Sequence, residues 1–355
     1  MRVSKVLDQK NRSSDWCKLI FLKYINVIYM KDKLNNRLDF IDVATGITMV
    51  LVVFGHNFFK EFQQDQFYAP LRVFIYQFHM SVFMFLSGFV VYYSFKQIDS
   101  FDQYVRYILK RIVKFLPPYL FLHLISILFD YLYGNIDNYQ IVENLKYMLL
   151  APANGSAGFL WYLYVLLFFY FITPLIKKIN DRYFFILISI TLFLTTIKLP
   201  QYFSMNLIGR YYFFFLIGGY FSDKISYIDK IVNNFNIYAI IFFIVMLINI
   251  YTINIHIPYQ IISICAIIIV LYISSCLNNN KNIQNIGIYS WYIYLLNTFI
   301  VGAIYIIFKK AHLIEIIPSL LFIVPSTFMG LYVPILLNKF MCRVLKSGSR
   351  RPRVA

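Results

Sequence analysis

The sequence predicts an all-helical protein that crosses a membrane about ten times. Of its 355 residues 60% are hydrophobic and 14% are charged, whereas a soluble domain carries about 25% charged residues. A helix needs roughly 20 apolar residues to cross a bilayer. Apolar runs of about this length recur along the chain. We expect spans at 40–59, 71–95, 112–133, 158–178, 183–199, 205–221, 235–255, 257–277, 286–308 and 317–341.

The elements follow one another without a long linker. Residues 1–38 are polar and basic, with an amphipathic stretch from Trp16 to Met30 that favours an interfacial helix. A second amphipathic stretch, Tyr139 to Leu150, lies in the longest outer connection. The runs at 183–199 and 205–221 are short, so they are expected to tilt little or to thin the bilayer. The simplest division is a basic N-terminal segment (1–38), one membrane domain (39–341) and a basic tail (342–355).

Lysine and arginine set the expected orientation, because positively charged short loops stay on the cytoplasmic side. With the N-terminus inside, most of the 33 basic residues fall on inner segments. The outer loops then hold only Lys60, Lys146, Lys198, Lys309 and Lys310. Both termini are therefore predicted to be cytoplasmic.

The net charge of +17 does not indicate a nucleic-acid partner. The basic residues are spread over short loops and two tails instead of gathering on one soluble face. Anionic lipid headgroups are the expected partner. The four cysteines, Cys17, Cys265, Cys276 and Cys342, lack C-x-x-C or zinc spacing, so neither a disulfide nor a metal site is predicted.

Two histidines lie inside runs apolar enough to span the bilayer. Ionisable groups at such depth are usually functional, since their burial costs free energy unless a partner or a wet cavity receives them. At 1.5 Å per residue, His56 lies roughly 24 Å above the inner end of its span and His79 about 12 Å below the outer end of its own. Arg72, Trp161 and Arg210 share this outer half, which predicts an external polar pocket.

A second polar group is expected in the inner half. Asp42 opens the first span, and Lys110, Arg111 and Lys114 open the third. These cations can bind phosphates. The alternative is that Lys110 and Arg111 only fix the topology and that Lys114 pairs with Asp42. His123, in the middle of the third span, has no evident role.

Six blocks in order resemble one known family. They are R-L-D-F-I-D-V-A-T-G-I-T-M-V-L-V-V-F-G-H (37–56), F-H-M-S-V-F-M-F-L-S-G-F (78–89), K-R-I-V-K-F-L-P-P-Y (110–119), L-W-Y-L-Y-V-L (160–166), Y-Y-F-F-F-L-I-G-G-Y (211–220) and I-G-I-Y-S-W-Y-I-Y-L-L-N (286–297). Their order resembles the acyltransferase-3 family of integral membrane O-acyltransferases, in particular the fucose 4-O-acetylase-like branch. The blocks cover most of the membrane domain.

The resemblance implies an enzyme of the bacterial inner membrane that transfers an acyl group, with acetyl favoured, from cytoplasmic acyl-coenzyme A to a hydroxyl. The acceptor is expected to be a sugar of a surface polysaccharide or of its lipid-linked precursor. Acetyl-coenzyme A is then a donor substrate, and no bound cofactor is expected. The inner group of Asp42, Lys110, Arg111 and Lys114 is assigned to donor binding.

The catalytic assignment follows from the chemistry of a hydroxyl acceptor. A hydroxyl is a weak nucleophile near neutral pH and needs a base, for which histidine is best suited. The resemblance places the catalytic histidine at His56, and His79 is a second candidate that alternatively binds the acceptor or orients His56. The expected partner of His56 is His79, Asn57 or a nearby tyrosine.

Four further residues are assigned to acceptor binding: Arg210, Trp161, Arg72 and Asn297. The arginines can bind sugar hydroxyls or an acidic sugar, or polarise the thioester carbonyl. In the alternative interpretation, the two arginines extend to the outer lipid headgroups. Trp161 would then be an ordinary aromatic residue of the membrane interface.

Two positions depart from the family pattern. Thr45 stands eleven positions before His56, where many members carry Arg or Lys. Asn297 stands where the ninth helix usually carries His. An amide is no general base, although it can form hydrogen bonds.

A transporter or flippase for a polysaccharide or lipid-linked sugar is the competing hypothesis. Buried His, Arg and Asp also mark transport paths, and Pro117, Pro118, Pro174, Pro325 and Pro334 can interrupt helices. No inverted repeat is evident in the hydropathy, which favours the enzyme. Consumption of a thioester distinguishes the two hypotheses.

Overall fold

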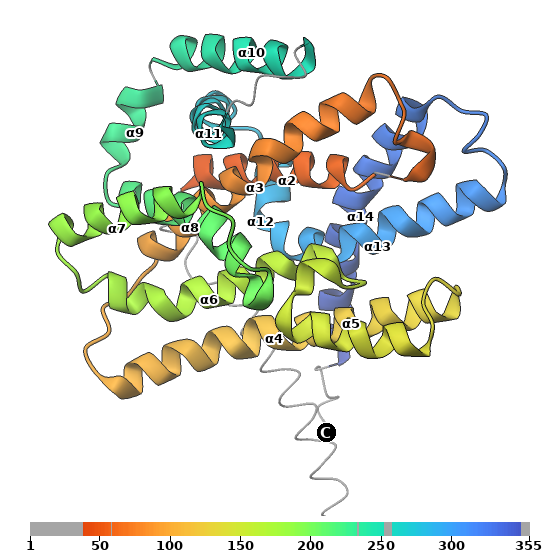
Figure 1. Ribbon diagram of the computed structural model, residues 1–355, viewed down its shortest axis with the longest axis horizontal. Helices are drawn as coiled ribbons and strands as arrows, with labels where there is room; N and C mark the ends of the chain where they lie inside the picture. The colour runs from red at the N-terminus through yellow and green to blue at the C-terminus, as the bar shows by residue number, and fades with distance from the viewer. Residues whose placement is uncertain (1–37, 58, 233, 252–257, 349–355) are drawn as a thin grey trace, which may run out of the picture. The chain divides into compact units, whose positions relative to one another are not determined.

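The computed structural model describes residues 38–57, 59–232, 234–251 and 258–348. Within these ranges the regular elements are helices, and no strand occurs (Figure 1). The expectation of an all-helical protein is therefore confirmed. The predicted interfacial helix and Cys17 lie outside the described residues.

The chain divides into two compact units. The described part of the smaller unit comprises residues 96–184 and 198–208. That of the larger unit comprises 38–57, 59–95, 185–197, 209–232, 234–251 and 258–348. The smaller unit contains α4 (Phe101–Leu132), α5 (Asn138–Leu150) and α6 (Trp161–Ile176). The larger unit contains α2 (Asp39–Gly55), α3 (Tyr68–Tyr93), α9 (Ile225–Val232), α10 (Phe235–Tyr251), α11 (Tyr259–Cys276), α12 (Lys281–Ile288), α13 (Ser290–Lys310) and α14 (Ser319–Gly348). Helices α7 (Asp181–Leu194) and α8 (Met205–Phe221) begin in the smaller unit and end in the larger one.

Six helical stretches in the described residues are long and apolar enough to cross a membrane. They are Tyr68–Tyr93, Phe101–Leu132, Gly158–Ile176, Tyr259–Cys276, Ser290–Lys310 and Ser319–Val344. The other four expected spans also contain helices, namely α2, α7, α8 and α10, but each of these is shorter than 18 residues. The count of about ten spans and the orientation of the termini stay predictions.

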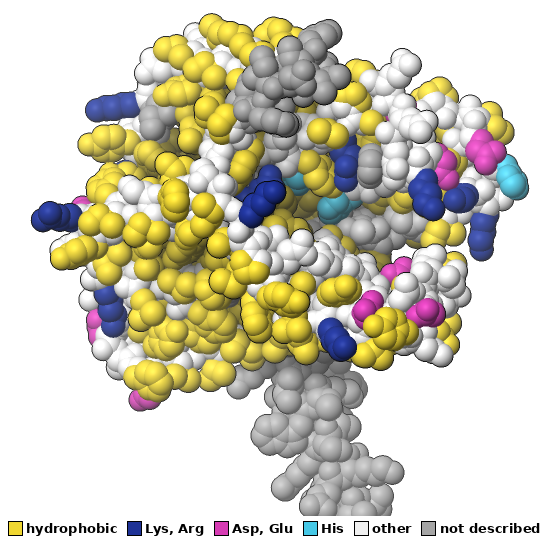
Figure 2. Space-filling view, viewed as in Figure 1, with side chains coloured by type: hydrophobic (Ala, Val, Ile, Leu, Met, Phe, Trp, Pro, Cys, Tyr) yellow, Lys and Arg dark blue, Asp and Glu magenta, His cyan; other side chains and the backbone are white. Residues whose placement is uncertain are grey.

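Apolar side chains predominate on the face of the molecule seen in Figure 2. Large hydrophobic residues are strongly exposed on several helices, for example Phe121 on α4, Phe193 on α7 and Leu321 on α14. Such surfaces are costly in water and stable against lipid tails. The exposed apolar side chains and the six long helices agree with a membrane protein.

The larger unit is held together by very close helix contacts. A Cβ atom added to Gly88 of α3 would lie 1.9 Å from the carbonyl oxygen of Phe215, and one added to Gly218 of α8 would lie 1.9 Å from that of Phe85. Glycine at both positions therefore lets the two backbones touch, as small residues do between membrane helices. This contact explains the glycines in the blocks 78–89 and 211–220.

The smaller unit is organised by capped helix starts. Helix α4 begins at Phe101, earlier than the expected span, because the Ser100 side chain accepts a hydrogen bond from the Gln103 backbone N–H. Helix α5 begins with a capping box between Asp137 and Gln140, at the amphipathic stretch identified in the sequence. Both α5 and α6 pack against α4.

Candidate active site

The C-terminal end of α2 is anchored by side chains of α3. The carbonyl oxygen of Gly55 accepts hydrogen bonds from Arg72 Nε at 2.9 Å and from the Tyr76 hydroxyl at 3.1 Å. The Tyr68 hydroxyl donates to the carbonyl oxygen of Phe54 at 2.9 Å. These bonds satisfy carbonyls that a helix end leaves free, and the Arg72 charge complements the negative end of the helix dipole. The residue that follows, His56, is thereby fixed in place.

Asn57 connects this helix end to α14. Its side-chain nitrogen donates to the carbonyl oxygen of Val53 at 3.1 Å and to Thr327 Oγ1 at 3.0 Å, and its side-chain oxygen accepts a hydrogen bond from Ser326. Both polar atoms of the buried Asn57 amide are therefore engaged. Asn57 supports the backbone next to His56.

The imidazole of His56 is oriented by α13. Its Nδ1 lies 2.6 Å from Oδ1 of Asn297. The Asn297 nitrogen donates to the carbonyl oxygens of Ile293 at 2.7 Å and of Tyr294 at 3.0 Å, so Oδ1 is the atom that faces the ring. An amide oxygen only accepts, which means that Nδ1 carries the hydrogen and Nε2 of the neutral ring holds the lone pair. Thr298 Oγ1 lies 3.2 Å from the same Nδ1.

His79 presents the same tautomer from α3. It is 4% exposed, and its Nδ1 lies 2.8 Å from the carbonyl oxygen of Ile75. A carbonyl oxygen also only accepts, so the lone pair of the neutral ring is again on Nε2. The Tyr76 ring packs at 4.6 Å from the imidazole and lies under the Arg72 guanidinium at 4.0 Å. The spacing of residues 72, 76 and 79 places all three on one face of α3.

Arg210 of α8 is held beside the histidines by Tyr259 of α11. Its guanidinium lies 4.4 Å from the centre of the Tyr259 ring, and the Tyr259 hydroxyl donates to the Arg210 carbonyl oxygen at 3.2 Å. The Nε atom of Arg210 is buried and has no hydrogen-bond partner within the described residues. His56, Arg72 and Arg210 all lie close enough to His79 to act on it electrostatically.

The larger unit therefore brings together five of the residues singled out in the sequence: His56, His79, Arg72, Arg210 and Asn297. Arg72 is tied to α2, because its Nε donates to the Gly55 carbonyl oxygen. Asn297 is 0% exposed, and its amide is engaged by His56 and by its own helix. Neither partnership was evident from the sequence, since Asn297 lies 241 positions from His56.

Asp42 lies elsewhere in the larger unit. It occupies the first turn of α2 and is 6% exposed, about 21 Å along the helix from His56. Thr45, one turn further, donates its hydroxyl to the carbonyl oxygen of Ile41 at 2.8 Å. Asp42 is therefore not part of the histidine cluster.

The remaining candidates belong to the smaller unit. On α4, Lys110 is exposed, whereas the Arg111 guanidinium lies over the rings of Tyr107 and Tyr170 at 5.0 and 4.5 Å. Lys114 is close enough to Arg111 for the two charges to interact. Trp161 begins α6 and is partly buried.

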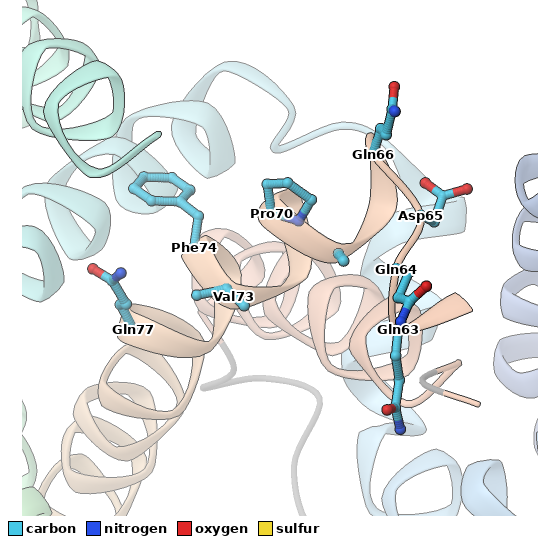
Figure 3. A pocket seen from close by; sticks show the side chains of 9 residues that line it. Gln63, Gln64, Asp65, Gln66, Pro70, Val73, Phe74 and Gln77 are labelled. Carbon is cyan, nitrogen blue, oxygen red and sulfur yellow. The ribbon is translucent and has the colours of Figure 1, made fainter. Parts of the chain in front are cut away.

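A pocket of about 450 Å³ opens beside the loop that joins α2 to α3 (Figure 3). Its lining combines polar and apolar side chains: Gln63, Gln64, Asp65, Gln66, Ala69, Pro70, Val73, Phe74 and Gln77. The helical period places Gln77 roughly opposite to His79 on α3. The pocket is thus separate from the histidine cluster. The amide groups in its lining can donate and accept hydrogen bonds, which suits them to binding hydroxyl groups.

A helical membrane domain that holds a half-buried His56 and a buried His79, each with the lone pair of the neutral ring on Nε2, beside two arginines has the groups that transfer to a hydroxyl requires. No cluster of metal-ligating side chains occurs in the described ranges. The acyltransferase-3 family model, described as an acyltransferase domain, matches residues 38–339. The chain belongs to this family of membrane acyltransferases. No curated protein and no solved structure matches the chain.

Proposed function

We propose that the protein is a membrane O-acyltransferase that moves an acetyl group from acetyl-coenzyme A to a sugar hydroxyl of a bacterial surface glycan or its lipid-linked precursor. The observation that carries the proposal is the Asn297–His56 hydrogen bond. It leaves His56 Nε2 as the basic atom of an oriented imidazole, which is what activation of a hydroxyl requires. The acetyl group and the glycan come from the family resemblance.

The transfer balances with one proton shuttled by His56. Nε2 removes the proton of the acceptor hydroxyl while the oxygen attacks the thioester carbonyl. The C–O bond forms, the C–S bond breaks, and the proton returns from the imidazolium to the departing thiolate. Asn297 Oδ1 accepts from Nδ1–H throughout, so it stabilises the imidazolium.

The arginines supply positive charge beside this reaction. We assign Arg210 to the acceptor or to the negative charge that develops on the carbonyl oxygen, because its buried Nε still has a hydrogen bond to donate. Arg72 holds the end of α2 and contributes its charge through the same cluster. His79 is assigned to acceptor binding or to a second proton transfer, and Trp161 to stacking on a sugar ring.

The donor is assigned to the basic start of α4. Lys110, Arg111 and Lys114 are the proposed partners of the coenzyme A phosphates, and Asp42 is retained as a donor-side residue. With cytoplasmic termini in the inner membrane, this group faces the compartment that holds acyl-coenzyme A. Thr45 carries no positive charge and cannot bind the donor phosphates as a cation would. We therefore assign that role to the basic residues of α4.

The test is the O-acetyl content of the surface glycan, measured by NMR. A deletion strain is complemented with wild type, His56→Ala or His79→Ala at matched abundance in the membrane. The proposal expects acetyl to disappear on deletion and to return with wild type but not with His56→Ala, while polymer still reaches the surface. Failure of polymer export with unchanged acetylation of the remaining polymer would instead support a transporter.

A further inference from the structure

His123 is the buried ionisable residue that the proposed mechanism leaves without a role. It lies in the middle of α4 and is 1% exposed. Both ring nitrogens are buried, and neither has a hydrogen-bond partner in the part of the chain that the structure describes. A buried polar group without a partner is costly. His123 is therefore suited to a ligand that brings hydrogen-bonding groups of its own.

The neighbour of His123 orients the ring but does not satisfy it. Tyr119, one turn earlier on α4, packs its ring 4.6 Å from the imidazole in an edge-on arrangement. The Tyr119 hydroxyl donates to the carbonyl oxygen of Met148 on α5, so its hydrogen is already used. Leu122 and Ile127 are buried and apolar. The buried residues on this part of α4 are thus mainly apolar, and the Ser126 hydroxyl is a further buried polar group there.

His123 and Arg111 lie on the same i, i+4 ridge of α4. The ridge, called the stripe below, consists of Arg111, Phe115, Tyr119 and His123, and it winds about 120° around the helix axis between its two ends. Arg111 and His123 are twelve positions apart, or roughly 18 Å along the helix. The stripe thus carries a cation at one end, two aromatic rings between, and an imidazole at the other end.

The cationic end of the stripe is also suited to an anion. The Nε atom of Arg111 is buried and has no hydrogen-bond partner among the described residues. The charge of Lys114 acts on the same region. Two cations in mutual reach repel each other in a low dielectric, and a phosphate bound to both relieves that repulsion.

We propose that His123 binds the amide-bearing pantetheine arm of the acyl donor, whose phosphates are held by Arg111 and Lys114. The inference rests on the proposed function, because the donor is acyl-coenzyme A. A neutral imidazole offers one N–H and one lone pair, which match the carbonyl oxygen and the N–H of amide groups. In coenzyme A the two amides of the pantetheine arm lie between the phosphates and the sulfur, so phosphates bound at Arg111 place the amides further along the stripe, toward His123.

The test uses the purified full-length protein in lipid nanodiscs and two variants of α4. His123→Leu removes the ring nitrogens and keeps an apolar side chain. Phe121→Leu is the control, because Phe121 is exposed and lies on the opposite face of the helix. Binding of coenzyme A is measured by calorimetry, and the unfolding temperature is measured with and without it.

We expect His123→Leu to unfold at or above the wild-type temperature without ligand, because it removes unsatisfied polar atoms. Its Kd for coenzyme A should rise about tenfold, as the loss of one hydrogen bond predicts, while Phe121→Leu binds normally. Pantetheine, which lacks the phosphates, should show the same loss with His123→Leu and none with Arg111→Gln.

Two results separate failure of this inference from failure of the proposed function. Equal binding of coenzyme A by wild type and His123→Leu, or destabilisation of His123→Leu without ligand, overturns the role of His123 alone. Absence of coenzyme A binding by wild type overturns the proposed donor as well.

Discussion

Replacing Asn297 by alanine is the most informative single change at the candidate site. It removes the oxygen that lies 2.6 Å from Nδ1 of His56, so the ring is free to turn and to exchange tautomers. A hydrogen bond to a charged group contributes roughly 1.5–3 kcal/mol, and the imidazolium exists only during transfer. We therefore expect kcat to fall about 10- to 100-fold, with little change in KM for acetyl-coenzyme A.

The assay is release of coenzyme A thiol from acetyl-coenzyme A with deacetylated glycan from the deletion strain as acceptor. Asn297→Asp keeps an oxygen that accepts from Nδ1–H and should retain more activity than Asn297→Ala. Ile307→Ala is the control on the same helix, because Ile307 is exposed and the change leaves the Asn297 oxygen in place. Wild-type kcat in Asn297→Ala would refute the reasoning that this amide orients the base.

Two further predictions concern stability. Gly218→Ala should lower the unfolding temperature by an amount equivalent to about 1–3 kcal/mol, because the new Cβ would lie 1.9 Å from the carbonyl oxygen of Phe85. Gly302→Ala is the control, because a Cβ added at Gly302 would have no neighbour within 4 Å. Equal unfolding temperatures for the two variants would contradict the close contact at Gly218. The hydrogen bond from Ser319, together with backbone N–H groups at the start of α3, lowers the pKa of Asp65, so its stabilisation is present at neutral pH and is lost as the pH falls through the lowered pKa. Asp65→Asn should weaken this acid dependence and cost roughly 1 kcal/mol at pH 7; identical profiles of unfolding temperature against pH would contradict it.

The long helices were predictable because apolar composition separates them from the connections, whereas the short helices α9 and α12 lie mostly in segments that were expected to be connections. Helix ends were less predictable: α2 was expected to reach residue 59, yet it ends at Gly55, where side chains from α3 take over its carbonyl oxygens. That termination depends on a neighbouring helix. The start of α4 is a local effect of the Ser100 cap, and it could have been found in the sequence.

The candidate site was predictable in its residue types but not in its pairings. His56 and His79 stood out because imidazoles are rare in apolar runs. The partner of His56 was sought among His79, Asn57 and tyrosines, whereas Asn297 occupies that position and Asn57 bonds to α14. Hydrophobic periodicity does not specify which residues of separate helices contact each other. The hydrogen bond between Arg72 and the Gly55 carbonyl oxygen was not predictable for the same reason.

The most direct test of the central claim is acceptor-dependent release of coenzyme A by the purified protein in nanodiscs. Wild type should release thiol only when the deacetylated glycan is present, and His56→Ala should be slower by roughly 100-fold or more, as loss of a general base predicts. His312→Asn, in the exposed loop after α13, should match wild type. Release by His56→Ala at the wild-type rate, or none by wild type while deletion of the protein stops glycan export, would contradict the account.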